Sequence, residues 1–191
     1  MWIRTLQKEG FTMKSMPRER KIHSKMVYES DFITLKEDLV RLPSGKEGKR
    51  IVVNHIGAAA TLPITKAGDV LLVRQHRYAV GEDVLEIPAG KKDTPDEDGK
   101  VCAKRELEEE TGYSAQNFIK LQSVYTAIGF SNELVEIYLA RDVYPMDHPP
   151  SSDEEEYVDL VKMPLSAAIK LAENGEIKDA KTALALLSLK V

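Results

Sequence analysis

The 191-residue chain has few of the features that mark several common classes of protein. Its single cysteine, Cys102, excludes an internal disulfide and fits a reducing cytoplasm. No apolar run approaches the roughly 18 residues that would indicate a membrane-spanning helix. The 27 lysines and arginines are outnumbered by 31 aspartates and glutamates, so the chain lacks the basic excess of a nucleic-acid-binding protein. We therefore expect a cytoplasmic protein that binds neither nucleic acid nor membrane.

The remaining composition is typical of a globular protein. Hydrophobic residues make up 42% of the chain and charged residues 30%, and the length suits one domain with a small appendage. Cys102 has no obvious base beside it in the sequence, so we interpret it as a small packed residue rather than a nucleophile.

The stretch from residue 90 to residue 113 carries the strongest local pattern. Its second half predicts a helix, because good helix formers surround apolar residues and no proline interrupts them. Gly112 is expected to end this helix. The start remains open between a capping box at Thr94, with Pro95 in the first turn, and a later cap at Asp98.

Three carboxylates share one face of this predicted helix. Glu109 and Glu110 lie three and four residues after Glu106, so the three side chains point the same way. Like charges at this spacing repel, and the C-terminal end of a helix also disfavours anions. A cation would offset this cost, and Mg²⁺ or Mn²⁺ prefers such oxygen ligands. The alternative is a solvated acidic face, the commoner meaning of a charge run.

The spacing of these residues resembles a known signature. Residues 105–113, RELEEETGY, are similar to the REUXEEXGU core of the Nudix hydrolases. Glu97 stands eight residues before Arg105, as that signature requires, and Gly90 opens it. Six residues rather than the usual five separate Gly90 from Glu97, so we expect a one-residue insertion in the loop with the helix still in register.

The resemblance implies a metal site and its supports. The residues LEIPAG at 85–90 are similar to a stretch in which the alanine carbonyl binds metal. Glu97 and Arg105 would form an ion pair that orients the ligands. The implied metal ligands are Ala89 through its carbonyl, Glu106, Glu109 and Glu110, with Glu109 also counted among the catalytic residues.

A small sheet is predicted before this region. Short apolar runs at residues 26–28, 32–35, 39–42 and 51–53, with a turn at 43–45, indicate antiparallel strands. Such a sheet is too small to be stable alone. It resembles the N-terminal part of ADP-ribose and nucleoside diphosphate sugar pyrophosphatases, where it helps to build a homodimer. The predicted division is a flexible arm at 1–24, a β-rich dimerisation element at 25–56 and a Nudix domain at 57–191.

Residues that would meet the substrate follow from the same resemblance. The RQHRY sequence at 74–78 is similar to RQYRY of this subgroup, which implies that Arg77 contacts the diphosphate or the terminal sugar. A surface ion pair is the alternative for Arg77. Glu86 either faces the substrate or pairs with a site arginine, and the sequence leaves both open. His76 is interpreted as a surface residue, because no nearby carboxylate is expected to orient it.

Two later segments bear on specificity and proton transfer. Residues 129–133, GFSNE, fit the subgroup's GFSDE pattern, which places Glu133 among the substrate contacts. Ile128 replaces the proline that marks strict ADP-ribose enzymes, so we expect a broader choice that includes GDP-mannose. In the acidic run 153–156, the resemblance implies that Glu154 or Glu156 is the general base; taken alone, the run would be a solvated charge cluster.

The fold class implied is α/β, an α/β/α sandwich with a mixed sheet, preceded by a small antiparallel β element. Two helices after residue 165 are expected to cover the sheet. The expected activity is Mg²⁺-dependent hydrolysis of nucleoside diphosphate sugars by a homodimer. The alternatives are a nucleoside triphosphate or capped-RNA pyrophosphohydrolase, and an inactive Nudix binding module.

Overall fold

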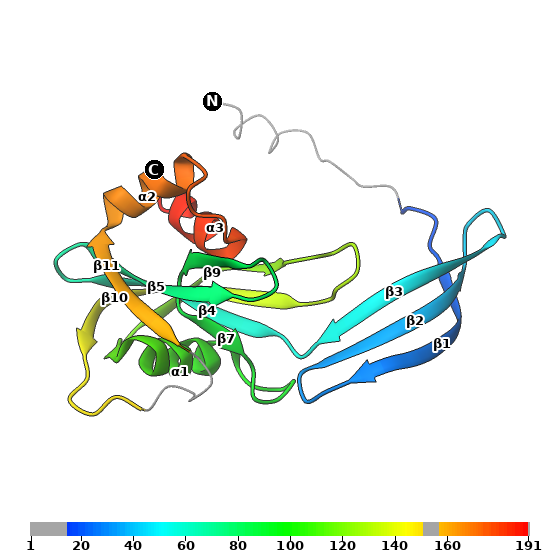
Figure 1. Cartoon of the computed structure of the whole chain (residues 1–191), viewed down its shortest axis with the longest axis horizontal. Helices are drawn as coiled ribbons and strands as arrows, with labels where there is room; N and C mark the ends of the chain where they lie inside the picture. Colours follow the sequence, from blue (N-terminus) through cyan, green and yellow to red (C-terminus); the bar gives the residue numbers. More distant parts are fainter. Residues whose placement is uncertain (1–14, 151–156, 191) are drawn as a thin grey trace.

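Two sheets make up most of the computed structural model, which describes residues 15–150 and 157–190 (Figure 1). The smaller sheet contains β1 (Arg20–Glu29), β2 (Ile33–Arg41) and β3 (Glu47–His55), all antiparallel and in that order. A tight turn joins β2 to β3, with Gly45 at a φ of 84° that favours glycine.

The smaller sheet differs from its prediction in two ways. The runs at 32–35 and 39–42 fall in the single strand β2 except for their outer residues, Phe32 and Leu42, because the polar residues between them continue the pairing with β3 without interruption. Residues 20–24 lie in β1 and pair with β2, so the flexible arm predicted to reach residue 24 extends too far.

The larger sheet has eight strands and is mixed. Strands β10 and β4 run parallel, and the other pairs are antiparallel. The central order is β11-β5-β4-β10-β8, with β6 on β5, β7 on β4 and β9 on β10. These strands are β4 (Ala58–Thr65), β5 (Asp69–Arg77), β6 (Glu82–Glu86), β7 (Ala89–Lys91), β8 (Tyr113–Ser114), β9 (Phe118–Tyr125), β10 (Leu134–Pro145) and β11 (Val158–Pro164).

Helices cover both faces of the larger sheet. Helix α1 (Gly99–Thr111) lies on one face, and α2 (Leu165–Glu173) and α3 (Ala180–Ser188) lie on the other (Figure 1). The sheet has a hydrophobic core on each face, and neighbouring residues of β5 point into different cores. Leu71 packs in the same core as Leu107 of α1, and Leu72 belongs to the core under α2 and α3. The predicted α/β/α sandwich with a mixed sheet is confirmed.

Backbone hydrogen bonds join the two sheets beside the chain connection. The loop between β9 and β10 runs along the end of β3, where Val53 N–H donates to Phe130 O at 2.7 Å and Asn132 N–H donates to Val53 O at 3.2 Å. The His55 N–H donates to the Asn132 side-chain oxygen at 2.8 Å. The end of β3 is therefore fixed to the loop that precedes β10.

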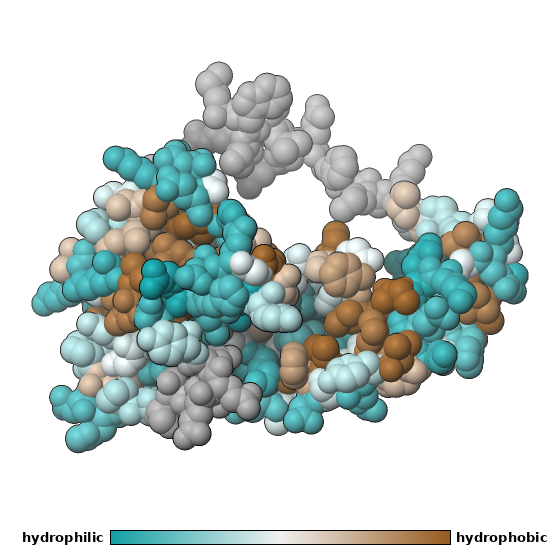
Figure 2. Space-filling model, in the orientation of Figure 1, coloured by the Kyte–Doolittle hydropathy of each residue, from teal (hydrophilic) through white to brown (hydrophobic). Residues whose placement is uncertain are grey.

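The smaller sheet presents many apolar side chains to solvent. Figure 2 shows apolar residues gathered on this part of the molecule. The exposed residues of its strands include Ile22, Met26, Val27, Tyr28 and Ile51. In the part of the chain that the structure describes, no helix combines the length and the apolar composition needed to cross a bilayer.

Candidate active site

A large cavity joins three parts of the fold. Its volume is about 1260 Å³. The acidic face of α1 lines one side of this cavity. The ends of β5 and β6 and the first turn of α3 line another part, and residues at the junction with the smaller sheet line the third. The polar residues that line the cavity include Arg77, Glu86, Arg105, Glu106, Glu109, Glu110, His55, Glu133 and Lys181.

Helix α1 is capped at its start by Asp98 and at its end by Gly112. The Asp98 carboxylate accepts hydrogen bonds from Lys100 N and Val101 N at 2.8 and 3.2 Å, so the later of the two possible caps is the one used. Gly112 ends the helix in the left-handed conformation, with a φ of 70°. Leu107 is buried on the sheet side, which turns the three glutamates toward the cavity.

Arg105 binds several groups at the acidic face. Its Nη1 lies 2.7 Å from a Glu106 oxygen and 3.2 Å from a Glu109 oxygen. Its Nη2 donates to Lys91 O at 3.1 Å and lies 3.5 Å from Glu97, which is the ion pair expected from the sequence. Burial alone would lower the pKa of Arg105, but the charge and hydrogen bond of Glu106 outweigh it and raise the pKa.

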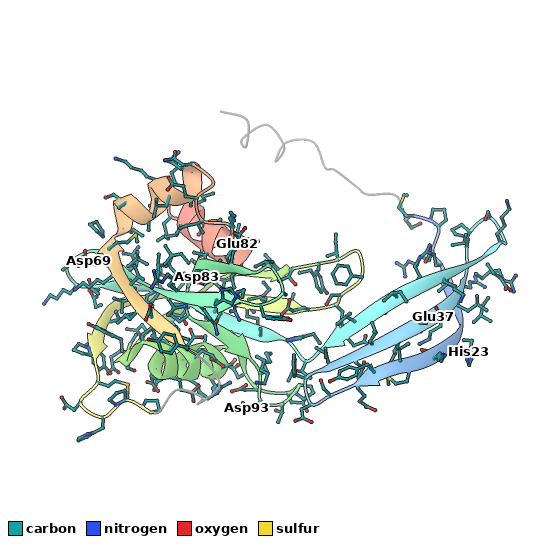
Figure 3. The ribbon with its side chains drawn as sticks, in the orientation of Figure 1. His23, Glu37, Asp69, Glu82, Asp83 and Asp93 are labelled. Atoms are coloured by element: carbon teal, nitrogen blue, oxygen red, sulfur yellow. The ribbon has the colours of Figure 1, made fainter. Side chains whose placement is uncertain are left out.

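The loop before α1 contains a hydrogen-bonded turn. Glu97 N–H donates to Thr94 O at 3.1 Å, and the Glu97 carboxylate accepts from Asp93 N at 2.8 Å. Asp93 lies where this loop approaches the smaller sheet (Figure 3). The turn ends before Asp98, which caps α1.

Strand β7 runs close against the carboxylates of α1. A Cβ atom placed on Gly90 would lie 2.2 Å from the Glu106 carboxylate, so only glycine leaves that carboxylate where it is. The Ala89 N–H donates to Glu110 at 3.1 Å. The carboxylates of Glu106, Glu109 and Glu110 supply oxygen ligands of the kind that a hard divalent cation prefers.

The carboxylates are held by protein groups. Among residues 15–150 and 157–190, no three acidic, histidine or cysteine side chains already form a group that could hold an ion. Arg105 hydrogen-bonds to Glu106 and Glu109, and the Ala89 N–H donates to Glu110. A cation entering here would exchange some of these contacts for its own.

Glu86 lies in a network of cations across the cavity. Arg77 binds it through two hydrogen bonds of 2.6 and 3.0 Å, and Lys181 Nζ binds the same carboxylate. Glu86 is 3% exposed. Burial would raise its pKa, but the hydrogen bond of Arg77 and the charge of Lys181 outweigh this and lower it. Of the two possibilities left open for Glu86, the structure contains the pair with a site arginine.

The first turn of α3 is fixed against the end of β6. The Asp179 carboxylate caps the helix by accepting from Thr182 N at 3.0 Å. The buried Thr182 hydroxyl accepts from Ile87 N at 2.8 Å. Figure 3 shows Glu82 beside this helix, where it pairs with Lys178 at 2.5 Å. Lys181 was missed by sequence reasoning, because 95 residues separate it from Glu86 and only the cap at Asp179 signalled a helix start.

A histidine and a glutamate lie together at the junction with the smaller sheet. His55 Nε2 is 3.7 Å from a Glu133 oxygen, and both residues line the cavity. The His55 ring packs edge-on against Phe32, with centroids 5.8 Å apart. Glu133 was expected to contact substrate, but His55 was not identified. His55 is the last residue of β3 and lies 77 residues before Asn132, its partner in the loop, so nothing near it in the sequence indicated the site.

Several predicted residues lie elsewhere. Ile128 is 81% exposed and is not among the described residues that line the cavity. His76 also lies outside this lining, but the expectation that no carboxylate could orient it is wrong, because its Nδ1 is 2.9 Å from Asp83. Cys102 is buried, which raises its pKa to about 12 and agrees with a packed residue. Glu154 and Glu156 lie outside the described residues.

Comparison with known protein families divides the chain in two. Residues 54–186 match the model of the NUDIX domain, and residues 19–53 match the nucleoside diphosphate sugar hydrolase N-terminal domain. This division falls close to the predicted one between residues 56 and 57.

Individual proteins match over most of the chain. An ADP-ribose pyrophosphatase of Bacillus subtilis is 38% identical over 179 residues, which cover 94% of this chain and 96% of the relative. A methanol dehydrogenase activator of Bacillus methanolicus is 35% identical with the same coverage. A GDP-mannose pyrophosphatase of Escherichia coli K12 is 32% identical over 139 residues, 68% of this chain and 71% of the relative. A crystal structure of an ADP compounds hydrolase has the same fold, with a TM-score of 0.79, 23% identity and coverage of 93% and 95%.

Proposed function

Because this chain belongs to the Nudix hydrolase family, we propose that it hydrolyses the diphosphate of nucleoside diphosphate sugars to a nucleoside monophosphate and a sugar phosphate. The observation that carries this proposal is the continuous cavity, which joins an acidic face to a second polar site at the smaller sheet. Its volume of about 1260 Å³ exceeds the usual range for a single small ligand. A substrate with two sugars, a base and two phosphates suits that space.

Nudix hydrolases generally need a divalent metal, and we propose Mg²⁺ or Mn²⁺ here. Bound ions would neutralise the diphosphate and make a water nucleophilic. The residues proposed to hold them are the Ala89 carbonyl, Glu106, Glu109 and Glu110. The oxygen donors of this set and the close approach of Gly90 to Glu106 support the proposal.

The other residues around the cavity position these groups. Arg105, tied to Glu97 and to the Lys91 carbonyl, keeps the loop before α1 against the acidic face. Arg77 lines the cavity with its guanidinium oriented by Glu86, in a suitable position to bind a phosphate oxygen of the substrate. Glu154 or Glu156 is proposed to accept the proton of the attacking water.

We also propose that the protein is a cytoplasmic homodimer. The exposed apolar residues of the smaller sheet and its match to the family's N-terminal domain support a homodimer held by this sheet. The single, buried Cys102 fits a reducing cytoplasm. Sedimentation at micromolar concentration should show a dimer, and a monomer would contradict this part of the proposal.

A substrate panel with Mg²⁺ tests the activity. The purified protein should hydrolyse ADP-ribose and GDP-mannose to a monophosphate and a sugar phosphate, with kcat/KM values within about a hundredfold of each other. Nucleoside triphosphates and capped RNA should be poorer substrates. Preferred hydrolysis of either would contradict the proposal, and binding without turnover of any compound would favour an inactive binding module.

A further inference from the structure

We propose that His55 and Glu133 together bind a hydroxyl group of a substrate sugar, as a donor and an acceptor placed side by side in the cavity wall. The inference rests on the proposed function and adds His55 as a residue that determines specificity. The two residues come from different parts of the chain, the end of β3 and the loop before β10.

The donor on His55 is fixed by its neighbours. Gly57 N–H donates to His55 Nδ1 at 3.0 Å, so Nδ1 carries a lone pair and the ring hydrogen is on Nε2. The backbone of His55 is held by Asn132, and its ring packs against Phe32. With its side chain 12% exposed, His55 presents Nε2–H in one defined direction.

The acceptor on Glu133 is also fixed. The Thr126 hydroxyl donates to one carboxylate oxygen of Glu133, and the Glu133 N–H donates to Ser131 Oγ at 3.1 Å. The other carboxylate oxygen faces His55. The hydrogen bond of Thr126 therefore leaves this second oxygen in position to interact with a ligand.

The distance between the two residues suits a group that contacts both from the side. Nε2 and the Glu133 oxygen are 3.7 Å apart, which is too long for a direct hydrogen bond and too short for an atom to lie between them. A group beside the pair can bond both residues if it accepts from Nε2 and donates to the carboxylate. A sugar hydroxyl does both. A phosphate does not, because it has no proton to donate and the Glu133 charge repels it.

Charge also separates this place from the diphosphate site. Glu133 is hydrogen-bonded by the neutral Thr126 hydroxyl, whereas Glu86 across the cavity is bound by two cationic side chains, Arg77 and Lys181. The anionic part of the substrate is therefore better placed toward Arg77 and the acidic face with its ions. The neutral, hydroxyl-bearing part then faces His55 and Glu133.

The test uses two substitutions of His55 that separate its two nitrogens. His55→Asn can keep an acceptor near Gly57 N–H but removes the donor that faces the cavity, whereas His55→Gln can place an amide donor near the position of Nε2. We expect His55→Asn to lower kcat/KM for ADP-ribose about tenfold, mainly through KM, as expected for one lost hydrogen bond, and His55→Gln to recover most of it.

Substrate analogues identify the hydroxyl. ADP-ribose analogues that each lack one hydroxyl group should include one that the wild-type enzyme hydrolyses about tenfold less well and for which His55→Asn causes no further loss. The control is His76→Asn, since His76 also lies beside a carboxylate but outside the cavity, and it should leave every kcat/KM unchanged.

Different failures have different meanings. An equal loss for every analogue, or a fall in kcat with KM unchanged, would overturn the inference while leaving the proposed function intact. A wild-type enzyme that hydrolyses no nucleoside diphosphate sugar would overturn both. Should His55→Asn fail to fold, Glu133→Gln gives the same test, because it should change the preference among the analogues at the same single hydroxyl.

Discussion

Replacing Lys181 with methionine tests whether the buried network around Glu86 stabilises the fold. The side chains of Lys181 and Glu86 are 13% and 4% exposed, and Arg77 supplies the other two hydrogen bonds to the carboxylate. Removing one partner of a fully buried ion pair costs about 3 to 5 kcal/mol. Because Arg77 remains in place, we expect about 2 kcal/mol, which lowers the Tm by roughly 4 to 8 °C for a domain of this size.

The dependence on pH provides a second measure of the same variant. The pKa of Glu86 is lowered in the folded protein, so its stabilising contribution is complete above the pKa of the unfolded chain and is lost as the pH falls through the folded pKa. Without Lys181 the folded pKa should rise toward its ordinary value. Acid unfolding of Lys181→Met should therefore begin at a higher pH than that of the wild type.

Urea unfolding followed by circular dichroism, at neutral pH and across the acid range, measures both effects. Lys178→Met is the matched control, because Lys178 is 65% exposed and its pair with Glu82 should contribute less than about 1 kcal/mol. Equal stability of the two variants at every pH would refute the assigned role of the network. Recovery of stability in the Lys181→Met, Glu86→Gln double variant would confirm that the loss of the Lys181 charge beside the Glu86 carboxylate is the cause.

Three further predictions concern activity. Glu110→Gln should lower kcat at least about a hundredfold without loss of folding, and activity within about threefold of wild type would contradict its role as a metal ligand. Gly90→Ala should fold but lose most activity, because the added Cβ displaces the Glu106 carboxylate, whereas Gly129→Ala, which has open space around it, should remain active in the same assay. Although the Ile128 side chain lies outside the cavity, Ile128 belongs to the same loop as Glu133, so Ile128→Pro should restrict that backbone and shift the kcat/KM ratio of ADP-ribose to GDP-mannose toward ADP-ribose, and an unchanged ratio would show that specificity is determined elsewhere.

The predictable part of the site is local in sequence. The acidic face of α1 follows from the spacing of Glu106, Glu109 and Glu110 alone, and Gly112 ends the helix as expected. The choice of Asp98 as the cap was not predictable, because two signals of similar strength lie within one turn of each other. Here the turn at residues 94–97 decided between them.

The unpredicted part depends on contacts between distant segments. Lys181 reaches Glu86 because α3 packs on the larger sheet, and His55 meets Glu133 because the loop before β10 hydrogen-bonds to β3. Nothing near either residue in the sequence indicates its partner. For Ile128 the local sequence was misleading. The proline that it replaces in related enzymes suggested that this residue forms a pocket wall, but its side chain is exposed to solvent.

The hydrogen bonds between β3 and residues 130–132 have a consequence for how this enzyme can evolve. They make the end of the smaller sheet part of the same frame that holds Glu133, whereas the acidic face of α1 is built separately on the larger sheet. On the proposed assignment of Glu133 to a sugar hydroxyl and of the α1 glutamates to the metal, mutations in the smaller sheet should change which sugar is preferred while the metal ligands stay in place.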